Sequence, residues 1–258
     1  MWRFLRISIL LFFLAVAAYS TLYDRLSTRD WDNTLWIGVF PVDADGTAAT
    51  RAYLERLTPA HVAEIEQFVN REARRYGIEL SRPIRVELYP EVHEKPPPLA
   101  PGAGAIARMS WSIRLRLYAR RNSHPAGRPA PQIRVFVLYH DPAFTAAVPH
   151  SVGLQKGLVG VVHAYAAADM TRPNNVVVTH EMLHMLGASD KYDLESLAPL
   201  YPIGYAEPDR NPRFPQSLTE IMAGRYAVDA STFEMPESLA EVRVGPQTAL
   251  EIGWTEPK

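Results

Sequence analysis

The chain has 258 residues, of which 47% are hydrophobic and 21% are charged, a composition that is ordinary for a folded globular domain. A formal net charge of −1 gives no global basic field, so the charge balance predicts no nucleic-acid partner. The absence of cysteine excludes disulfides and thiolate metal sites, so histidines and carboxylates must hold any metal.

The N-terminus combines arginines with an apolar run. Arg3 and Arg6 precede residues 7–22, which are almost entirely apolar. Because about 20 apolar residues span a bilayer, we interpret residues 1–23 as an uncleaved signal anchor. A cleaved signal peptide is the alternative, since residues 15–17 resemble a cleavage site. Both interpretations place the rest of the chain outside the cytoplasm.

The next segment is predicted to run from a linker into a strand and a helix. Residues 24–34 are expected to be a polar linker, and residues 35–42 a buried strand. A helix is expected from Thr58, which can cap it, to Gly77, which can end it. Residues 84–88 alternate apolar and polar side chains, which predicts a half-buried strand.

Strand signals dominate the middle of the chain. Residues 91–104 are rich in Pro, Gly and Ala and predict an exposed loop. Residues 111–119 alternate apolar and polar side chains, so we predict a strand there, with a helix as the alternative. Further strands are expected at 133–139 and 158–164. His163 in the last of these is expected to be a buried core histidine, although that strand could also edge a cleft and pair with an extended peptide.

The C-terminal third begins with a helical pattern. The period becomes helical from residue 175 to 186, residues 194–216 are Pro-rich and irregular, and residues 247–254 predict a short closing helix. Strands mixed with a few helices, without regular alternation, predict an α+β fold. We expect one domain over residues 35–258.

The segment His180-Glu181-Met182-Leu183-His184 carries the chemistry. Positions i and i+4 share one face of a helix, so both histidines can bind one ion. Glu181 can then reach a water on that ion. Zinc lowers the pKa of its bound water to about 7, and a carboxylate can take the proton as the water attacks a carbonyl. This is the H-E-x-x-H pattern, and the alternative is a helix face whose histidines are only hydrogen-bonded.

A third ligand is suggested by Gly187 and Asp190, which follow the motif. Gly187 can adopt a positive φ and end the helix, so the chain can turn back and bring Asp190 to the same metal. Two histidines and one carboxylate complete the three protein ligands of a typical catalytic zinc. Asp193 and Glu207 are alternative third ligands. A calcium site that includes Asp190, Asp193, Glu207 and Asp209 is a further alternative, beside a simple solvated acidic loop.

These residues resemble the metzincin clan of zinc peptidases. The signature of that clan is H-E-x-x-H-x-x-G-x-x-H, with Asp as the last residue in the snapalysin-type branch. The Asp version is matched position for position by His180, Glu181, His184, Gly187 and Asp190. As a whole, the chain looks more like a family of bacterial membrane-anchored proteins with this motif than like any characterised peptidase.

The resemblance also implies a methionine-containing turn, the Met-turn, beneath the metal. Residues 219–224 look like this turn, with Met222 as its methionine, and an ordinary buried methionine is the alternative. Some metzincins carry a tyrosine two residues after the methionine, but Gly224 stands there. Tyr192 and Tyr226 are therefore the nearest candidates for a hydrogen-bond donor to the transition state.

Taken together, the resemblance implies a metzincin-like α+β domain with a mixed sheet, a long packing helix, an active-site helix and a small C-terminal subdomain. We expect a zinc metalloendopeptidase that acts on protein or peptide substrates, with Glu181 as the general base. Its expected location is the periplasmic side of a bacterial inner membrane, or outside the cell after signal cleavage. The alternatives are a non-catalytic membrane-anchored binding module with a structural metal, and a metal hydrolase of a non-peptide amide or ester.

Overall fold

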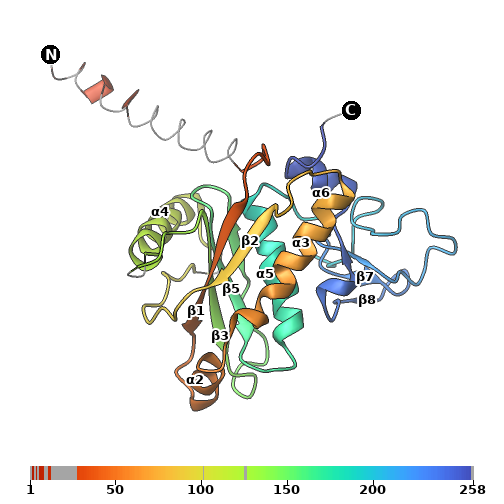
Figure 1. Cartoon of the computed structure of the whole chain (residues 1–258), viewed down its shortest axis with the longest axis horizontal. Coiled ribbons are helices and arrows are strands. Elements are labelled where there is room, and N and C mark those ends of the chain that lie inside the picture. The colour runs from red at the N-terminus through yellow and green to blue at the C-terminus, as the bar shows by residue number, and fades with distance from the viewer. Residues whose placement is uncertain are drawn as a thin grey trace.

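A computed structural model of the chain (Figure 1) describes residues 2, 4, 6–8, 11–12, 28–100, 102–124 and 127–256. Most of the predicted membrane segment, residues 1–23, and the first residues of the predicted linker, 24–27, lie outside the described residues. None of the helices within the described ranges is both long enough and apolar enough to cross a membrane.

A five-stranded mixed sheet forms the centre of the fold. Its strands are β1 (Leu35–Asp43), β2 (Ile84–Leu88), β3 (Ile133–His140), β4 (Val152–Leu154) and β5 (Val159–Tyr165). The spatial order is β2-β1-β3-β5-β4. All neighbours are parallel except β4, which runs antiparallel to β5. The short strand β4 therefore forms one edge of the sheet.

Helices cover both faces of this sheet (Figure 1). On one face pack α3 (Ala63–Arg75) and α5 (Thr171–Met185), which share a core with Val39 of β1. On the other face α4 (Ala105–Asn122) shares a second core with Phe40. Successive strand residues point to opposite faces, so the central strands are buried on both sides. This explains why they appear in the sequence as continuous apolar runs.

The C-terminal region packs on the same core as α3 and α5. Leu239, Val242 and Ile252 are fully buried in that core. The elements of this region are β6 (Thr219–Glu220), β7 (Tyr226–Ala227), β8 (Phe233–Glu234), η2 (Leu239–Glu241), β9 (Val242–Arg243) and α6 (Pro246–Glu251). The two remaining short helices, α2 (Ala48–Leu54) and η1 (Pro59–His61), connect β1 to α3.

The α+β class predicted from the sequence is confirmed, as are the four predicted strands other than 111–119. The long helix begins at Pro59 as the short turn η1, continues as α3, and ends before Gly77, which has a φ of 82°. Helix α5 begins at Thr171, about one turn earlier than predicted. Pro173 does not prevent this, because the first turn of a helix has no internal use for its N–H group.

The strand predicted at residues 111–119 is wrong, because this segment lies inside α4. Trp111, Leu115 and Tyr118 are buried at helical spacing, whereas Ile113 and Leu117 are exposed. Because apolar residues occupy both faces of the helix, the two sets together alternate with polar residues along the sequence, as in a strand. The alternative considered for residues 158–164, an edge strand that pairs with an extended peptide, does not hold, since β4 lies outside β5.

Trp31, which falls within the predicted linker, is part of the core. Its side chain is 5% exposed, and its indole Nε1 donates a hydrogen bond of 2.8 Å to the carbonyl of Ile252. The ring also lies edge-on to Trp254, with 5.7 Å between ring centroids. The chain just before β1 is therefore fastened to the C-terminal end of the domain.

The assignment of α4 predicts a contrast between two leucines. Leu115→Ala should lower the free energy of unfolding by about 2–5 kcal/mol, because it opens a cavity against the sheet. Leu117→Ala should change it by less than about 0.5 kcal/mol, because that side chain lies on the outer face. Urea denaturation of both variants measures the contrast. Equal losses would indicate that both residues share one buried face, as they would in a strand.

Candidate metal centre

The two histidines of the motif lie in the last turns of α5, on the same face. Their ring centroids are 4.7 Å apart. The helix ends at Gly187, which has a φ of 102°, a conformation that favours glycine. The N–H of Ala188 then donates to the carbonyl of Leu183 at 3.0 Å, which closes the helix end. The chain turns back as predicted.

This return brings Asp190 beside both histidines. The distance between the two Nε2 atoms of His180 and His184 is 3.1 Å. Asp190 Oδ1 lies 3.2 Å from the Nε2 of His180 and 3.1 Å from that of His184. Ligands about 2.0–2.1 Å from a tetrahedral zinc are separated by roughly 3.3–3.4 Å. The three atoms therefore form a nearly equilateral triangle of the size that such an ion requires.

Hydrogen bonds at the far side of each ring determine which nitrogen faces the centre. His180 Nδ1 lies 2.9 Å from the carbonyl of Ile221, and His184 Nδ1 lies 2.8 Å from the carbonyl of Ala188. A carbonyl can only accept, so each Nδ1 carries a proton, and the tautomer that can bind a metal has its Nε2 lone pair directed inward. Asp190 Oδ1 is buried and accepts no hydrogen bond of normal geometry from a described residue. Three lone pairs thus converge, and this donor set fits a cation.

The carboxylate of Asp190 remains charged in this environment. Burial alone would raise the pKa of Asp190, but the protonated forms of the adjacent His180 and His184 rings, which donate to the carboxylate and carry positive charge, hold it well below its usual value. The same contact acts on His184, where burial lowers the pKa, but Asp190, the carbonyl of Ala188 and the charge of Glu181 together outweigh burial, so that the pKa is raised. The site therefore supplies one negative charge that stabilises positive charge at its centre.

Glu181 lies beside this triangle and is only 7% exposed. Burial raises its pKa, although the two neighbouring histidines oppose the shift. The backbone N–H of Gly153 in β4 donates a hydrogen bond to its carboxylate. A side chain at Gly153 would place its Cβ only 2.2 Å from the carbonyl oxygen of Glu181, so the close approach of β4 to α5 requires glycine.

A pocket of about 570 Å³ opens in front of these residues. Besides the triangle and Glu181, its walls include the edge strand, the turn after Met222 and the side chains of His150, His163 and Tyr192. His163 was expected in the core, but it is only partly buried and its Nδ1 lies 2.9 Å from His140 Nε2. Burial and the neighbouring His140 lower the pKa of His163 to about 4. Its ring is therefore neutral at pH 7.

The two candidate tyrosines lie in different places. Tyr192 lines the pocket, with its ring centroid 6.5 Å from that of His180, and burial together with the nearby Asp190 raises its pKa. Tyr226 lies in β7, where its hydroxyl donates to Glu234 Oε2 at 2.9 Å. It is not among the residues that line the pocket. The structure thus brings Tyr192, and not Tyr226, to the candidate centre.

The other candidate ligands are engaged elsewhere. Asp193 Oδ1 accepts hydrogen bonds from the backbone and the hydroxyl of Ser196, both at 2.8 Å. Glu207 forms an ion pair with Arg210 at 3.1 Å. Among the described residues, the only group of three or more potential ligands whose ligand atoms lie within 4.8 Å of one another is the triangle itself. The acidic residues of the 190–209 segment do not gather into a calcium site.

The predicted Met-turn lies directly below α5. Met222 is fully buried, and the carbonyl of the preceding Ile221 is the partner of His180. The buried carboxylate of Glu220 organises the turn, because it accepts hydrogen bonds from the backbone N–H groups of Met222 and Ala223 at 2.6 and 3.0 Å. The same carboxylate accepts from the N–H of Gly245 at 3.0 Å, which joins the turn to the start of α6.

Known proteins do not identify this centre, because the chain matches no protein-family model and no curated protein.

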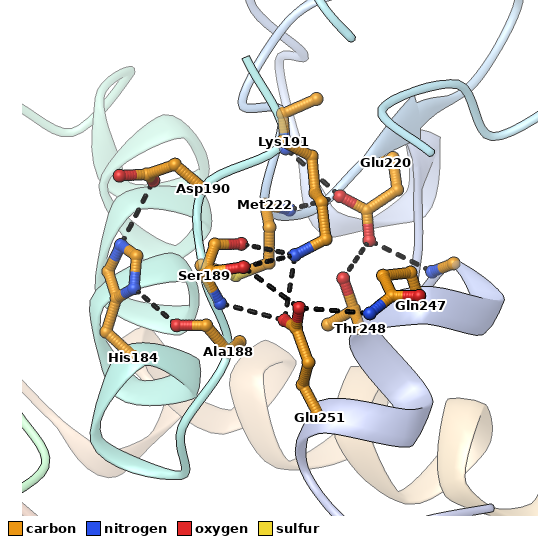
Figure 2. Close-up of polar contacts among 12 residues, drawn as sticks. His184, Ala188, Ser189, Asp190, Lys191, Glu220, Met222, Gln247, Thr248 and Glu251 are labelled. Atoms are coloured by element: carbon orange, nitrogen blue, oxygen red, sulfur yellow. Dashed lines mark hydrogen bonds and ion pairs between the residues drawn. The ribbon is translucent and has the colours of Figure 1, made fainter. Parts of the chain in front are cut away.

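Lys191 holds the returning chain in place (Figure 2). Its side chain is 1% exposed, and its Nζ lies 2.7 Å from Glu251 Oε2 and 2.7 Å from the carbonyl of Ser189. Its backbone N–H donates to the carbonyl of Met222 at 2.9 Å. Lys191 therefore connects the segment that carries Asp190 to both α6 and the Met-turn. No local sequence pattern indicates this role, since Glu251 lies 60 positions away.

Removing the buried ammonium should destabilise the domain. Lys191→Met leaves Glu251 without its cation, and breaking a buried pair in this way typically costs about 3 kcal/mol. The double variant Lys191→Met/Glu251→Gln should lose less than the single variant, because no charge is then left unpaired. Urea denaturation measures the stabilities of Lys191→Met, of Glu251→Gln and of the double variant.

A matched control is Arg210→Met, which breaks the more exposed pair with Glu207 and should cost no more than about 1 kcal/mol. Losses in the Lys191 and Glu251 variants that simply add would show that the two side chains do not interact.

Proposed function

We propose that this protein is a metzincin-type zinc metalloendopeptidase. The observation that carries the proposal is the triangle of His180, His184 and Asp190, with its three ligand atoms 3.1–3.2 Å apart and a buried Glu181 beside it. The order of strand, long helix, further strands, motif helix, irregular segment and Met-turn is also the order that the resemblance implies.

In this proposal His180, His184 and Asp190 hold the zinc ion. Bound zinc supplies a Lewis acid and lowers the pKa of a coordinated water to about 7. The donor set has two neutral nitrogens and one carboxylate oxygen, and such ligands suit zinc better than calcium. The carbonyls of Ile221 and Ala188 fix both rings from behind, which is the usual role of outer partners of metal-binding histidines.

Glu181 acts as the general base. Its carboxylate takes the proton of the attacking water and transfers it to the leaving nitrogen of the scissile bond. A raised pKa suits this task, because a base works best when its pKa lies nearer the working pH. Tyr192 is positioned in the pocket to donate a hydrogen bond to the oxygen that becomes negatively charged in the transition state.

A peptide substrate is favoured over a small amide or ester by the edge of the sheet. Val152 and Gly153 of β4 line the pocket, and β4 has a strand neighbour on only one side. An unpaired strand edge can bind an extended peptide through backbone hydrogen bonds. We therefore place the substrate chain alongside β4. The signal anchor and the periplasmic location, or secretion after cleavage, remain predictions from the sequence.

The rival proposal is a non-catalytic module with a structural zinc. Structural sites are normally closed by four protein ligands. Asp193 and Glu207, the other carboxylates considered as ligands, could supply a fourth ligand, but they are bound by Ser196 and by Arg210 instead. The pocket also leaves the centre open on one side. These features support a catalytic site with a free coordination position.

Metal content tests the centre itself. The purified full chain should contain one zinc per molecule by mass spectrometry, and Asp190→Ala should lose most of it, because one of three ligands is gone. Asp193→Ala is the matched control and should retain the zinc, since that carboxylate is bound by Ser196. Equal zinc content in both variants would rule out Asp190 as the third ligand.

Activity tests the role of Glu181. Glu181→Gln should retain zinc but lower peptide hydrolysis by at least about 10²-fold, because the amide cannot accept the water proton. Hydrolysis of a quenched fluorescent peptide library and of ester substrates, with zinc content measured in parallel, separates the alternatives. Zinc binding without hydrolysis of any substrate by the wild type would favour the structural module, and cleavage of esters alone would favour the non-peptide hydrolase.

A further inference from the structure

The outer face of α4 presents an apolar stripe to solvent. Its members are Ile106, Met109, Ile113 and Leu117, which are between 46% and 80% exposed. Spacings of three and four residues place them on one side of the helix. The opposite side, which includes the fully buried Leu115, packs on the sheet from Trp111 onward, away from α3 and α5 (Figure 1). The stripe is therefore not part of the core that holds the helix in place.

Positive charge is concentrated around this stripe. Residues 95–140 contain eight of the 27 basic residues of the chain and none of its 28 acidic ones. Five of the eight are arginines of α4, namely Arg108, Arg114, Arg116, Arg120 and Arg121. None of the five forms an ion pair with a described residue, in contrast to Arg71 and Arg75 of α3, Arg82 and Arg85.

The arginines flank the stripe on both sides. At 100° per residue, Arg114 and Arg121 lie along one border of the stripe and Arg116 lies along the other, whereas Arg120 follows Leu117 at the C-terminal end of the stripe. An apolar stripe between basic borders is typical of a helix that lies in the plane of a membrane interface. The long stems of arginine also allow the charged groups to reach upward while the helix is partly immersed.

We propose that α4 is a docking surface for an anionic phospholipid bilayer. Ile106, Met109, Ile113 and Leu117 enter the acyl boundary, and the flanking guanidinium groups bind headgroup phosphates. A second copy of the chain fits this face poorly, because two such helices would place arginines against arginines, and the acidic side chain that contacts α4, Glu94, is bound to Asn122 at the end of the helix. A nucleic acid would leave the apolar stripe in water.

The predicted anchor of residues 1–23 would strengthen the docking of α4 to the bilayer. A tether converts docking into an intramolecular event, so even weak affinity of α4 for lipid suffices to orient the domain. Docking through α4 does not depend on the zinc proposal, since the stripe includes none of the residues that line the metal pocket. The two proposals can therefore fail separately.

A fluorescent probe on α4 tests the inference in the full chain. Because the chain has no cysteine, Ile113→Cys provides a unique position for an NBD label. In vesicles of phosphatidylcholine with phosphatidylglycerol, we expect blue-shifted emission and protection from acrylamide, and both should diminish at high salt. In vesicles of phosphatidylcholine alone, neither should appear. Adding Arg114→Gln and Arg121→Gln should lower the docked-to-undocked ratio on the order of tenfold.

The matched control is Gln67→Cys, an exposed position on α3 at the opposite face of the sheet, whose emission should be the same in both kinds of vesicle. Circular dichroism of each labelled chain verifies that it is folded. Identical emission from position 113 in both kinds of vesicle would overturn the proposal. A blue shift that grows with protein concentration and not with anionic lipid would also overturn it, because a second copy would then cover the stripe.

Discussion

Three lone pairs point at one another in the interior of this domain, and this repulsion is the constraint on which the site depends. His180 and His184 are locked as acceptors by the backbone carbonyls of Ile221 and Ala188, and Asp190 adds a full negative charge. Without a cation such an arrangement costs free energy. The rest of the structure must therefore hold these groups together, and a bound metal ion would relieve the strain between them.

Three separate parts of the chain provide this support. Gly187 reverses the chain, the turn around Met222 supplies the carbonyl behind His180, and α6 receives the ammonium of Lys191. The contacts at His180 and Lys191 are partly buried and polar, so loss of one partner leaves the other unsatisfied. Helix α5 itself is fixed against the sheet by the glycine contact at β4, which also aligns the edge strand with the pocket.

Local chemistry made most of this site predictable. The spacing of His180 and His184 and the backbone freedom of Gly187 act within three turns of chain, so the sequence predicted both the helix end and the approach of Asp190. The Lys191–Glu251 pair and the placement of His163 arise from long-range packing that no local pattern reports. Helix α4 was predicted as a strand because a helix with two apolar faces has no single helical period.

The buried contact between Lys191 and Glu251 also limits how this sequence can change over time. A single substitution at either position leaves an unpaired charge in the interior. Replacing both residues with neutral side chains leaves no unpaired charge. Homologous chains should therefore vary at these two positions together. Such paired variation would show that the segment that carries Asp190 and helix α6 have evolved together.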